Sequence, residues 1–437
     1  MPTAGVGRES AGVTGSPTQA DLLAERKRFA FNVAIDLRPA GFDWRPVKGR
    51  LSSRFSWFET DHDLLIVAGI QEGHEADLAL AYGLKLRGSR QLQLVLPRAF
   101  AAATLQRSAF LKDDAQPTVY VHELGWGEIA PTRLKQRKAR SKDEAIAAVM
   151  KRIPGTMTPE EELTDAATPK HLGDRSGAVA QLVDWATRHP RLDPGHRKGE
   201  RSWHCMGQKV LSIRGTKAKG LAIRAGIHYS APGKALQPIT LAPKQNLTDG
   251  ELDAIRTAVG TAIEARTQQG GGFHKPDEHW LQAVIRRHPE LVGVEQPALR
   301  ELPAWRPGGG EQPWGRGYVD LAGLDGSGDI RIVETKLAKN SDDMLIFQGL
   351  DYYIWAQAYD RALRSRLGAA KGARFVVHYV IGEDPGTKSV HVSGYAAAQA
   401  AALDIPWRCQ VVRDWFFPDP QPAGAATAEM LNEGTLP

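Results

Sequence analysis

The sequence predicts a multidomain α/β protein. Its 437 residues exceed the roughly 100–200 residues of one ordinary domain, so we expect more than one folded unit. Apolar, strand-like runs alternate with amphipathic helical segments along much of the chain, as in α/β proteins. Hydrophobic residues make up 42% and charged residues 24%, a composition that excludes a fibre or a wholly disordered chain.

The N-terminal part carries the clearest alternation. Residues 1–20 are small, polar and rich in Gly and Pro, and we expect them to form a disordered tail. An N-terminal α/β domain is expected over residues 21–134. Its βαβαβ rhythm predicts a small parallel sheet. The expected strands are 63–69, 91–97 and 118–124, and the expected helices are 75–86 and 99–111.

A linker and a middle region follow. Residues 135–170 begin with a basic, non-periodic run at 135–142, continue with an expected helix at 143–153, and are expected to connect two units. The middle region, 171–270, is expected to be α+β. Thr248 and Glu251 have the spacing of a capping box and predict the start of a helix at about 249. Its other expected elements are a helix at 178–188 and strands at 208–213 and 221–229.

Three consecutive glycines at 270–272 mark the main predicted boundary, because glycine is costly in any regular element. The block 273–417 is expected to form a C-terminal domain with the order α–β–β–α–β–β–α–β. Residues 418–437 are rich in Pro, Ala and Gly and are expected to be a flexible tail.

The first helix of the C-terminal block is expected to follow Pro276, which suits a first helical turn. Trp280, Leu281, Val284 and Ile285 form its apolar stripe. Glu278 leans toward this packed side, where a carboxylate is costly unless a charged partner meets it.

A hairpin is expected next, from strands at 317–324 and 330–337 joined by a Gly/Asp/Ser turn. With a five-residue loop, Asp320 falls opposite Glu334. Lys336 lies two residues beyond Glu334 and projects from the same face. Like charges that face each other destabilise a hairpin, so a bridging cation such as Mg²⁺ or Mn²⁺ is the expected compensation.

These residue types suit the hydrolysis of a phosphodiester. Carboxylate oxygens hold Mg²⁺ or Mn²⁺ and leave positions open for water and a phosphate oxygen. A nearby ammonium group can orient the nucleophile and stabilise the charge that develops on phosphorus. Asp320, Glu334 and Lys336 provide these groups.

The motif series resembles the PD-(D/E)XK nuclease superfamily, and its Gly-x-x-Asp, Glu-x-Lys and Gln-x-x-x-Tyr motifs resemble the RecB-like branch. The resemblance covers about residues 273–417. It implies a restriction-endonuclease-like mixed sheet flanked by helices and a metal-dependent nuclease. Val319 stands where the superfamily name has Pro, a departure that RecB-like members tolerate.

The resemblance also implies roles for individual residues. Asp320, Glu334 and the Thr335 backbone carbonyl would be metal ligands, with Glu278 as an auxiliary acidic ligand. Lys336 would be the catalytic lysine. Two accessory residues, Gln348 and Tyr352, would lie one turn apart on the following helix and reach toward the site or the DNA backbone.

Each assignment has a plainer alternative. An isolated Glu-x-Lys is usually a solvated strand face, and Glu278 could simply serve the helix dipole. Aromatic residues at helical spacing around Tyr352 are usually core. Arg361, Arg364 and Arg366 could track phosphates or form an ordinary basic helix end.

The expected partner is nucleic acid, with DNA favoured over RNA, in a defence, restriction or repair role. The net charge of +6 permits a polyanionic partner without requiring one. The alternatives are a catalytically silent nuclease fold that binds nucleic acid or assembles with other proteins, and a sensor-effector protein with a ligand-binding N-terminal domain. No dinucleotide or P-loop motif occurs, so an ATP-driven step would need a separate NTPase or helicase partner. A homo-oligomer is also possible.

Two cysteines, Cys205 and Cys409, are too few for a disulfide framework or a Cys-based zinc site. No apolar run is long enough to cross a bilayer, and the first twenty residues lack the apolar core of a secretory signal. We therefore expect a cytoplasmic protein without a membrane partner.

Overall fold

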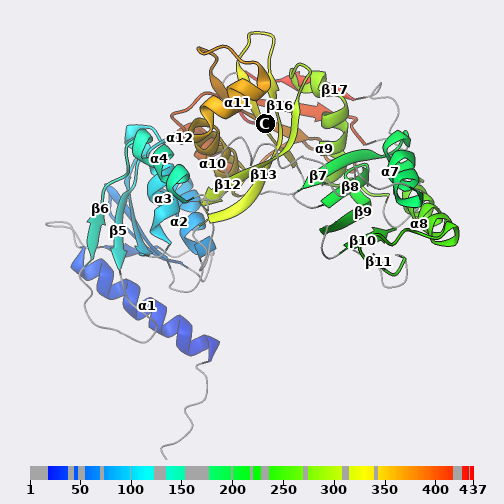
Figure 1. Ribbon diagram of the computed structural model, residues 1–437. Helices are drawn as coiled ribbons and strands as arrows, with labels where there is room; N and C mark the ends of the chain where they lie inside the picture. The colour runs from blue at the N-terminus through cyan, green and yellow to red at the C-terminus, as the bar shows by residue number, and fades with distance from the viewer. Residues whose placement is uncertain are drawn as a thin grey trace, which may run out of the picture.

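The computed structural model describes residues 18–37, 44–47, 55–68, 73–98, 100–122, 134–152, 177–197, 200–216, 220–227, 236–268, 274–307, 314–338, 343–416, 426–432 and 434–437. These residues form a mixed α/β protein with three separate sheets (Figure 1). Residues 18–20, expected to belong to the disordered tail, instead form the cap and the start of a helix that begins at Gln19. The predictions for residues 1–17 and for the glycines at 270–272 lie outside the described residues. No helix in the described part of the chain combines the length and hydrophobicity needed to cross a bilayer.

The N-terminal sheet has the order β1-β2-β3-β4-β5-β6. The predicted parallel arrangement is confirmed, because β3 pairs with β4 and β4 with β5 in parallel. The strands are β1 (Arg45–Pro46), β2 (Phe55–Glu59), β3 (Asp63–Ala68), β4 (Gln91–Pro97), β5 (Thr118–His122) and β6 (Lys135–Arg137), and the helices are α1 (Gln19–Asp36), α2 (Gly73–Leu86), α3 (Ala101–Ser108) and α4 (Lys142–Arg152).

Two of these elements lie where a linker was expected, and one of them, α4, confirms the helix expected at 143–153. The basic run contributes β6, which extends the sheet by pairing with β5 in antiparallel fashion. Helix α4 packs against α3 and against a helix of the C-terminal region. All three side chains of β6 are exposed, so this short edge strand has no periodic apolar pattern that could predict it.

The middle region forms a five-stranded antiparallel sheet, β11-β10-β9-β8-β7. Only two of its strands were expected, and the second, β10, ends at Ala225 rather than near 229. The capping box is confirmed, with Thr248 and Glu251 each satisfying a backbone N–H of the other. The elements are α7 (Ala178–Arg188), β7 (Asp193–Arg197), β8 (Glu200–Cys205), β9 (Gln208–Thr216), β10 (Gly220–Ala225), β11 (Ile239–Leu241) and α8 (Asp249–Thr267).

The C-terminal sheet has the order β12-β13-β14-β15-β16-β17. Strands β12, β13 and β14 are antiparallel, whereas β14, β15 and β16 are parallel. The elements are α9 (Glu278–Arg287), β12 (Leu299–Pro307), β13 (Trp314–Leu324), β14 (Ile330–Leu337), α10 (Leu345–Ala358), α11 (Asp360–Leu367), β15 (Phe375–Gly382), α12 (Gly394–Ala402), β16 (Trp407–Arg413) and β17 (Thr427–Met430).

The predicted order of these elements needs correction. Three strands, not two, follow α9, and α12 separates β15 from β16. Residues 427–430, expected to be part of a flexible tail, form β17 and pair with β16. This strand is exposed along its length, and its sequence therefore has no apolar alternation that could predict a strand. Only its pairing with β16 determines its position.

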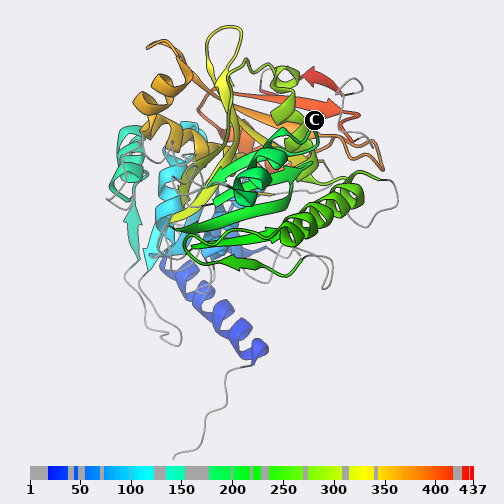
Figure 2. The same ribbon diagram turned by 45° about the vertical axis from the view of Figure 1, so that its right-hand side comes forward.

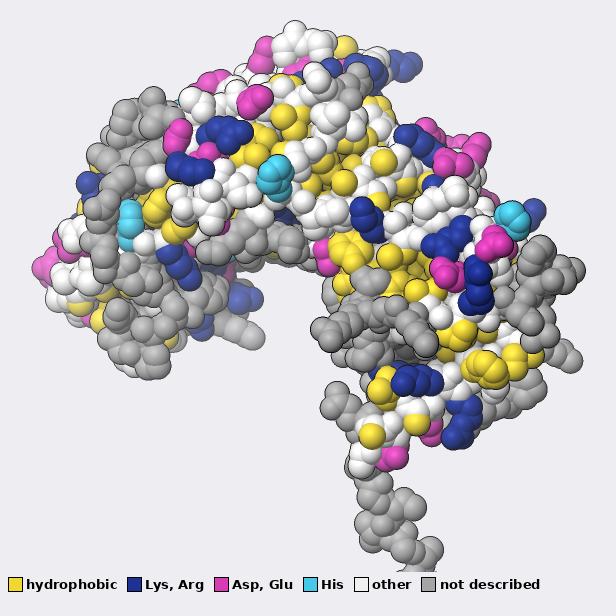
Figure 3. Space-filling model, turned by 180° about the vertical axis from the view of Figure 1, so that it is seen from behind, with side chains coloured by type: hydrophobic (Ala, Val, Ile, Leu, Met, Phe, Trp, Pro, Cys, Tyr) yellow, Lys and Arg dark blue, Asp and Glu magenta, His cyan; other side chains and the backbone are white. Residues whose placement is uncertain are grey.

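Both other units pack on the C-terminal sheet. One apolar core joins α2 and the N-terminal sheet to α10 and to one face of the C-terminal sheet, and a second core joins the middle sheet and α8 to α9 and the opposite face. The two outer units therefore lie on different sides of the C-terminal sheet (Figures 1 and 2). A view from behind shows two lobes separated by a broad notch, with basic and acidic side chains intermixed on that face (Figure 3).

Candidate active site

A fork between two strands of the C-terminal sheet forms the candidate site. The β13–β14 ladder begins at Leu324–Ile330, as predicted, and its last pair is Leu321–Val333. Beyond this point β13 stays paired with β12, and β14 stays paired with β15 as far as Leu337. The next residue is Asp320 on β13 and Glu334 on β14. The two strands therefore separate where the two predicted acids lie.

Asp320 is held inside this fork by three hydrogen bonds. Its Oδ2 accepts from the Thr335 backbone N–H at 3.0 Å and from the Thr335 hydroxyl at 2.6 Å. Its Oδ1 accepts from Gln282 Nε2 at 2.9 Å. The carboxylate thus satisfies an N–H that pairing with β13 would otherwise have satisfied. All three residues are buried, which makes these bonds strong determinants of the side-chain position.

The backbone on the other side of Asp320 is also irregular. Strand β12 pairs with β13 at Arg300–Leu321 and at Leu302–Val319, but the intervening Glu301 and Asp320 are not paired in the ladder. Glu301 has a φ of 46°, a left-handed conformation that costs a non-glycine residue about 1–3 kcal/mol. Such strain often accompanies functional sites, and here it coincides with a predicted catalytic residue.

Helix α9 brings a third acid to the fork. Asp277 is the N-cap and accepts from the Trp280 N–H, so Pro276 lies before the cap and not in the first turn as expected. Asp277 also forms an ion pair with the buried Arg266, which fixes the start of the helix. Glu278 is the first helical residue, and its side chain is 26% exposed.

Lys336 connects the acids. Its Nζ donates to Glu278 Oε1 at 2.9 Å and lies 3.6 Å from Glu334 Oε1. Burial alone would lower the pKa of Lys336, but the charges of Glu334 and Glu278, with that of Asp320, outweigh this effect and raise it. Lys336 is therefore a cation at neutral pH. Burial raises the pKa of Glu278, an effect that Lys336 opposes.

The structure thus brings together the four residues predicted as the catalytic set. Thr335, predicted to contribute its carbonyl, is adjacent, and because its N–H points at Asp320 its carbonyl faces the same edge of β14. Glu334 is 1% exposed and Asp320 8% exposed, so neither acid belongs to a solvated strand face.

Gln348 and Tyr352 lie on α10, as expected. Tyr352 is buried, and its hydroxyl accepts from the Tyr318 backbone N–H at 3.2 Å and from Gln348 Nε2 at 3.4 Å. A Cβ on Gly317 would lie 2.7 Å from the Tyr352 hydroxyl, so the ring packs directly on β13. Through these contacts, Tyr352 packs against the backbone of β13 at Gly317 and Tyr318, two to three residues before Asp320. Gln348 contacts the Tyr352 hydroxyl. Their predicted accessory role stays a prediction.

Sequence analysis did not identify Gln282 as a site residue. Its amide donates to Asp320 and, at 3.4 Å, to Glu278, so it links the helix acid to the strand acid. Gln282 lies four residues after Glu278, so both side chains are on one face of the helix. This spacing was the sequence feature from which its place in the site could have been predicted. An amide gives a weaker sequence signal than an acid on a packed helix face, because burial of a neutral group costs less than burial of a charge.

The oxygen atoms of this site suit a hard divalent cation. Among the described residues, no three His, Cys, Asp or Glu side chains are grouped closely enough to hold a metal ion by themselves. Mg²⁺, however, is commonly held by one or two carboxylates together with waters and substrate phosphate. Asp320 and Glu334, with the Thr335 carbonyl, fit this pattern, and Lys336 occupies the position next to Glu278.

Comparisons with protein-family models, with curated proteins and with solved structures found no match to the chain.

Proposed function

We propose that the protein is a metal-dependent nuclease that hydrolyses phosphodiester bonds, with DNA as the favoured substrate, and that its C-terminal domain has a restriction-endonuclease-like fold. One observation carries the proposal. The Lys336 ammonium lies between the carboxylates of Glu278 and Glu334, next to Asp320, where two strands separate. Acids and a cation that are buried or partly buried at a backbone irregularity are typical of catalytic sites.

The topology is consistent with this fold. Strand β14, which carries Glu334 and Lys336, is antiparallel to β13 and parallel to β15, so the sheet is mixed at the site. Helices α9 and α10 both pack against β14. The motif order expected from the sequence is therefore found on a helix, two adjacent strands and a second helix.

Each residue would have a distinct task. Asp320, Glu334 and the Thr335 carbonyl would hold Mg²⁺ or Mn²⁺, with Glu278 in an auxiliary position. When bound, such an ion lowers the pKa of a coordinated water and neutralises charge on the phosphate. Gln282 and Thr335 would keep Asp320 oriented through the hydrogen bonds described above.

Lys336 would act as a fixed positive charge rather than as a base. Its raised pKa keeps the ammonium protonated at neutral pH, and it can therefore donate hydrogen bonds to the attacking water or to a phosphate oxygen. Stabilisation of the developing negative charge by such a preorganised group is worth roughly 10²–10³ in rate. The buried setting increases the effect, because water screens the charge less.

Cleavage assays test this proposal. The full-length protein should cut linear or circular DNA, duplex or single-stranded, with Mg²⁺ or Mn²⁺, and EDTA should stop the reaction. Lys336→Ala and Asp320→Ala should each abolish cleavage, while Lys371→Ala, a change in an exposed turn, should not. Cleavage that survives both site substitutions would refute the assignment. Binding to DNA without cleavage by the unmodified protein would instead favour a catalytically silent nuclease fold.

A further inference from the structure

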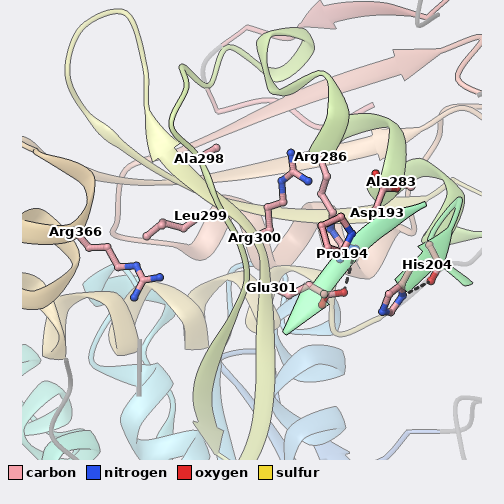
Figure 4. A pocket seen from close by; sticks show the side chains of 12 residues that line it. Asp193, Pro194, His204, Ala283, Arg286, Ala298, Leu299, Arg300, Glu301 and Arg366 are labelled. Carbon is pink, nitrogen blue, oxygen red and sulfur yellow. Dashed lines mark hydrogen bonds and ion pairs between the residues drawn. The ribbon is translucent and has the colours of Figure 1, made fainter. Parts of the chain in front are cut away.

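A cavity of about 270 Å³ with several charged side chains in its lining lies beside the candidate active site. Its walls come from β7 and β8 of the middle sheet, from α9, from β12 and from the end of α11, so it forms where the middle and C-terminal units meet. Figure 4 shows His204 and Asp193 on one side, Arg366 on the other, and Arg300 and Arg286 between them. The volume is near the lower end of the roughly 300–1,000 Å³ found for small-molecule pockets.

Positive charge predominates in this cavity. Three arginines, Arg286, Arg300 and Arg366, line it against two acids, Asp193 and Glu301. Both acids are already engaged by arginines. Glu301 pairs with Arg286 at 3.0 Å, and Asp193 pairs with Arg287, which lies just behind the lining, at 2.9 Å.

Arg300 differs from Arg286 and Arg287, which each form an ion pair with one of these acids. In the described part of the chain, no acidic side chain lies within ion-pairing distance of its guanidinium group. Desolvation lowers the pKa of Arg300, and the nearby Arg286 and Arg287 lower it further, against the opposing effect of Asp193. A guanidinium group held beside other guanidinium groups is stabilised when an anion binds.

The cavity adjoins the candidate active site along one helix. Arg286 lines the cavity and lies one turn from Gln282 on α9, and its NH2 is 3.5 Å from Gln282 Oε1. Gln282 in turn donates to Asp320. Glu301, the ion-pair partner of Arg286, is the strained residue of β12 that lies beside Asp320 in the sheet. A ligand in the cavity would therefore lie next to the groups that orient the catalytic carboxylate.

We infer that this cavity is a phosphate-binding subsite, in which Arg300 and Arg366 bind a phosphate group of a nucleotide close to the catalytic acids. The inference rests on the proposed nuclease function for the nucleotide character of the ligand. Arginine favours phosphate because its planar guanidinium group makes paired hydrogen bonds to phosphate oxygens. His204 adds a neutral wall, since burial lowers its pKa and its ring is hydrogen-bonded to Gly207 O and Ser202.

The phosphate could belong to the backbone of a bound strand or to a free nucleotide, and two measurements separate these sources. The first is fluorescence anisotropy of the full-length protein with a short labelled DNA in EDTA, so that no strand is cut. The second is calorimetric titration with a nucleoside 5′-monophosphate. Both use the unmodified protein, the double variant Arg300→Gln/Arg366→Gln, and the control Arg188→Gln, an exposed arginine on α7 that does not line the cavity.

The double variant should bind DNA about tenfold or more weakly, and the slope of log K against log salt should fall by about one for each phosphate that the protein no longer neutralises. Arg188→Gln should bind within about twofold of the unmodified protein. A loss confined to DNA identifies the strand backbone as the source, and a loss that includes the mononucleotide identifies a nucleotide site. Thermal melting of all variants checks that they are folded.

Equal DNA affinity in the unmodified protein and the double variant, with no mononucleotide binding that depends on these arginines, would overturn the inference. A protein that binds neither ligand would overturn it as well. The proposed nuclease function is tested by a different result: it is refuted if the unmodified protein does not cut DNA. Binding that depends on Arg300 and Arg366, without any cleavage, would support the phosphate-binding subsite and refute the nuclease function.

Discussion

Lys336 Nζ lies 2.9 Å from Glu278 Oε1, although 58 residues separate the two in sequence. The contact joins the first residue of α9 to the centre of the C-terminal sheet. It makes the ammonium of Lys336 part of a group of carboxylates that no single local segment contains. The site therefore depends on how α9 docks on the sheet as much as on the hairpin itself.

Removal of the Lys336 charge should destabilise the protein in a pH-dependent way. The raised pKa of Lys336 means that its protonation stabilises the fold. This contribution is complete below its unfolded value of 10.5 and is lost only as pH rises through the higher folded value, so it is present in full at pH 8. Lys336→Met should thus lower the free energy of unfolding at pH 8 by about 2–3 kcal/mol, because it leaves buried carboxylates uncompensated.

At lower pH this loss should shrink. Burial raises the pKa of Glu278, and the variant removes the opposing effect of Lys336, so Glu278 takes up a proton more readily in the folded variant. Urea denaturation at pH 8 and at pH 5 measures the difference. Lys371→Met is the control and should change stability by less than about 0.5 kcal/mol at both values. An equal loss at the two pH values would contradict the electrostatic explanation.

Gln282→Ala should impair cleavage through the position of Asp320. The substitution removes the amide that donates to Asp320 Oδ1, and removal of such a supporting hydrogen bond typically costs about 10–100-fold in metal affinity or activity. We expect a higher Mg²⁺ concentration for half-maximal cleavage, with partial recovery at high Mg²⁺. Gln181→Ala, an exposed change on α7, is the matched control. An unchanged Mg²⁺ dependence would exclude this positioning role.

Arg107→Met should weaken the attachment of the N-terminal unit to the C-terminal sheet. Arg107 on α3 is buried and forms ion pairs with Asp77 on α2 and with Asp351 on α10. Without it, two carboxylates stay in the interior uncompensated, and we expect a loss of about 3–5 kcal/mol. Chemical denaturation and limited proteolysis measure the effect.

The control is Arg45→Ala, which removes an ion pair with Asp61 that is exposed on both sides and should cost less than about 1 kcal/mol. Equal losses in the two variants would show that burial of the Arg107 pairs has no energetic consequence.

Tyr352→Phe separates a packing role from a catalytic one. The hydroxyl accepts from the partly buried Tyr318 N–H, so its removal should destabilise the protein by about 1–2 kcal/mol. Cleavage at a temperature where the variant is folded should fall by less than about threefold, because the described contacts of the hydroxyl are to the strand backbone and to Gln348. A much larger loss of cleavage, with stability unchanged, would indicate a direct role in catalysis.

The hairpin and its acids could be predicted from sequence because they depend on local rules. Strands with alternating apolar residues, joined by a Gly- and Asp-rich turn, fix the register at Leu324–Ile330, and that register places Asp320 opposite Glu334. The parallel pairing of β3, β4 and β5 follows equally from alternating strands and helices. In both cases, neighbours in sequence are also neighbours in space.

Tertiary structure alone decided what surrounds these acids. Three features show this dependence, because each requires contact between different segments of the chain. They are the hydrogen bond of Gln282 to Asp320, the distortion of β12 at Glu301, and the cavity lined by Arg300. Edge strands β6 and β17 are exposed and carry no periodic pattern, so only their partners define them. Local propensity and periodicity act over a few residues, whereas the docking of α9 and of the middle sheet depends on burial summed over the whole chain.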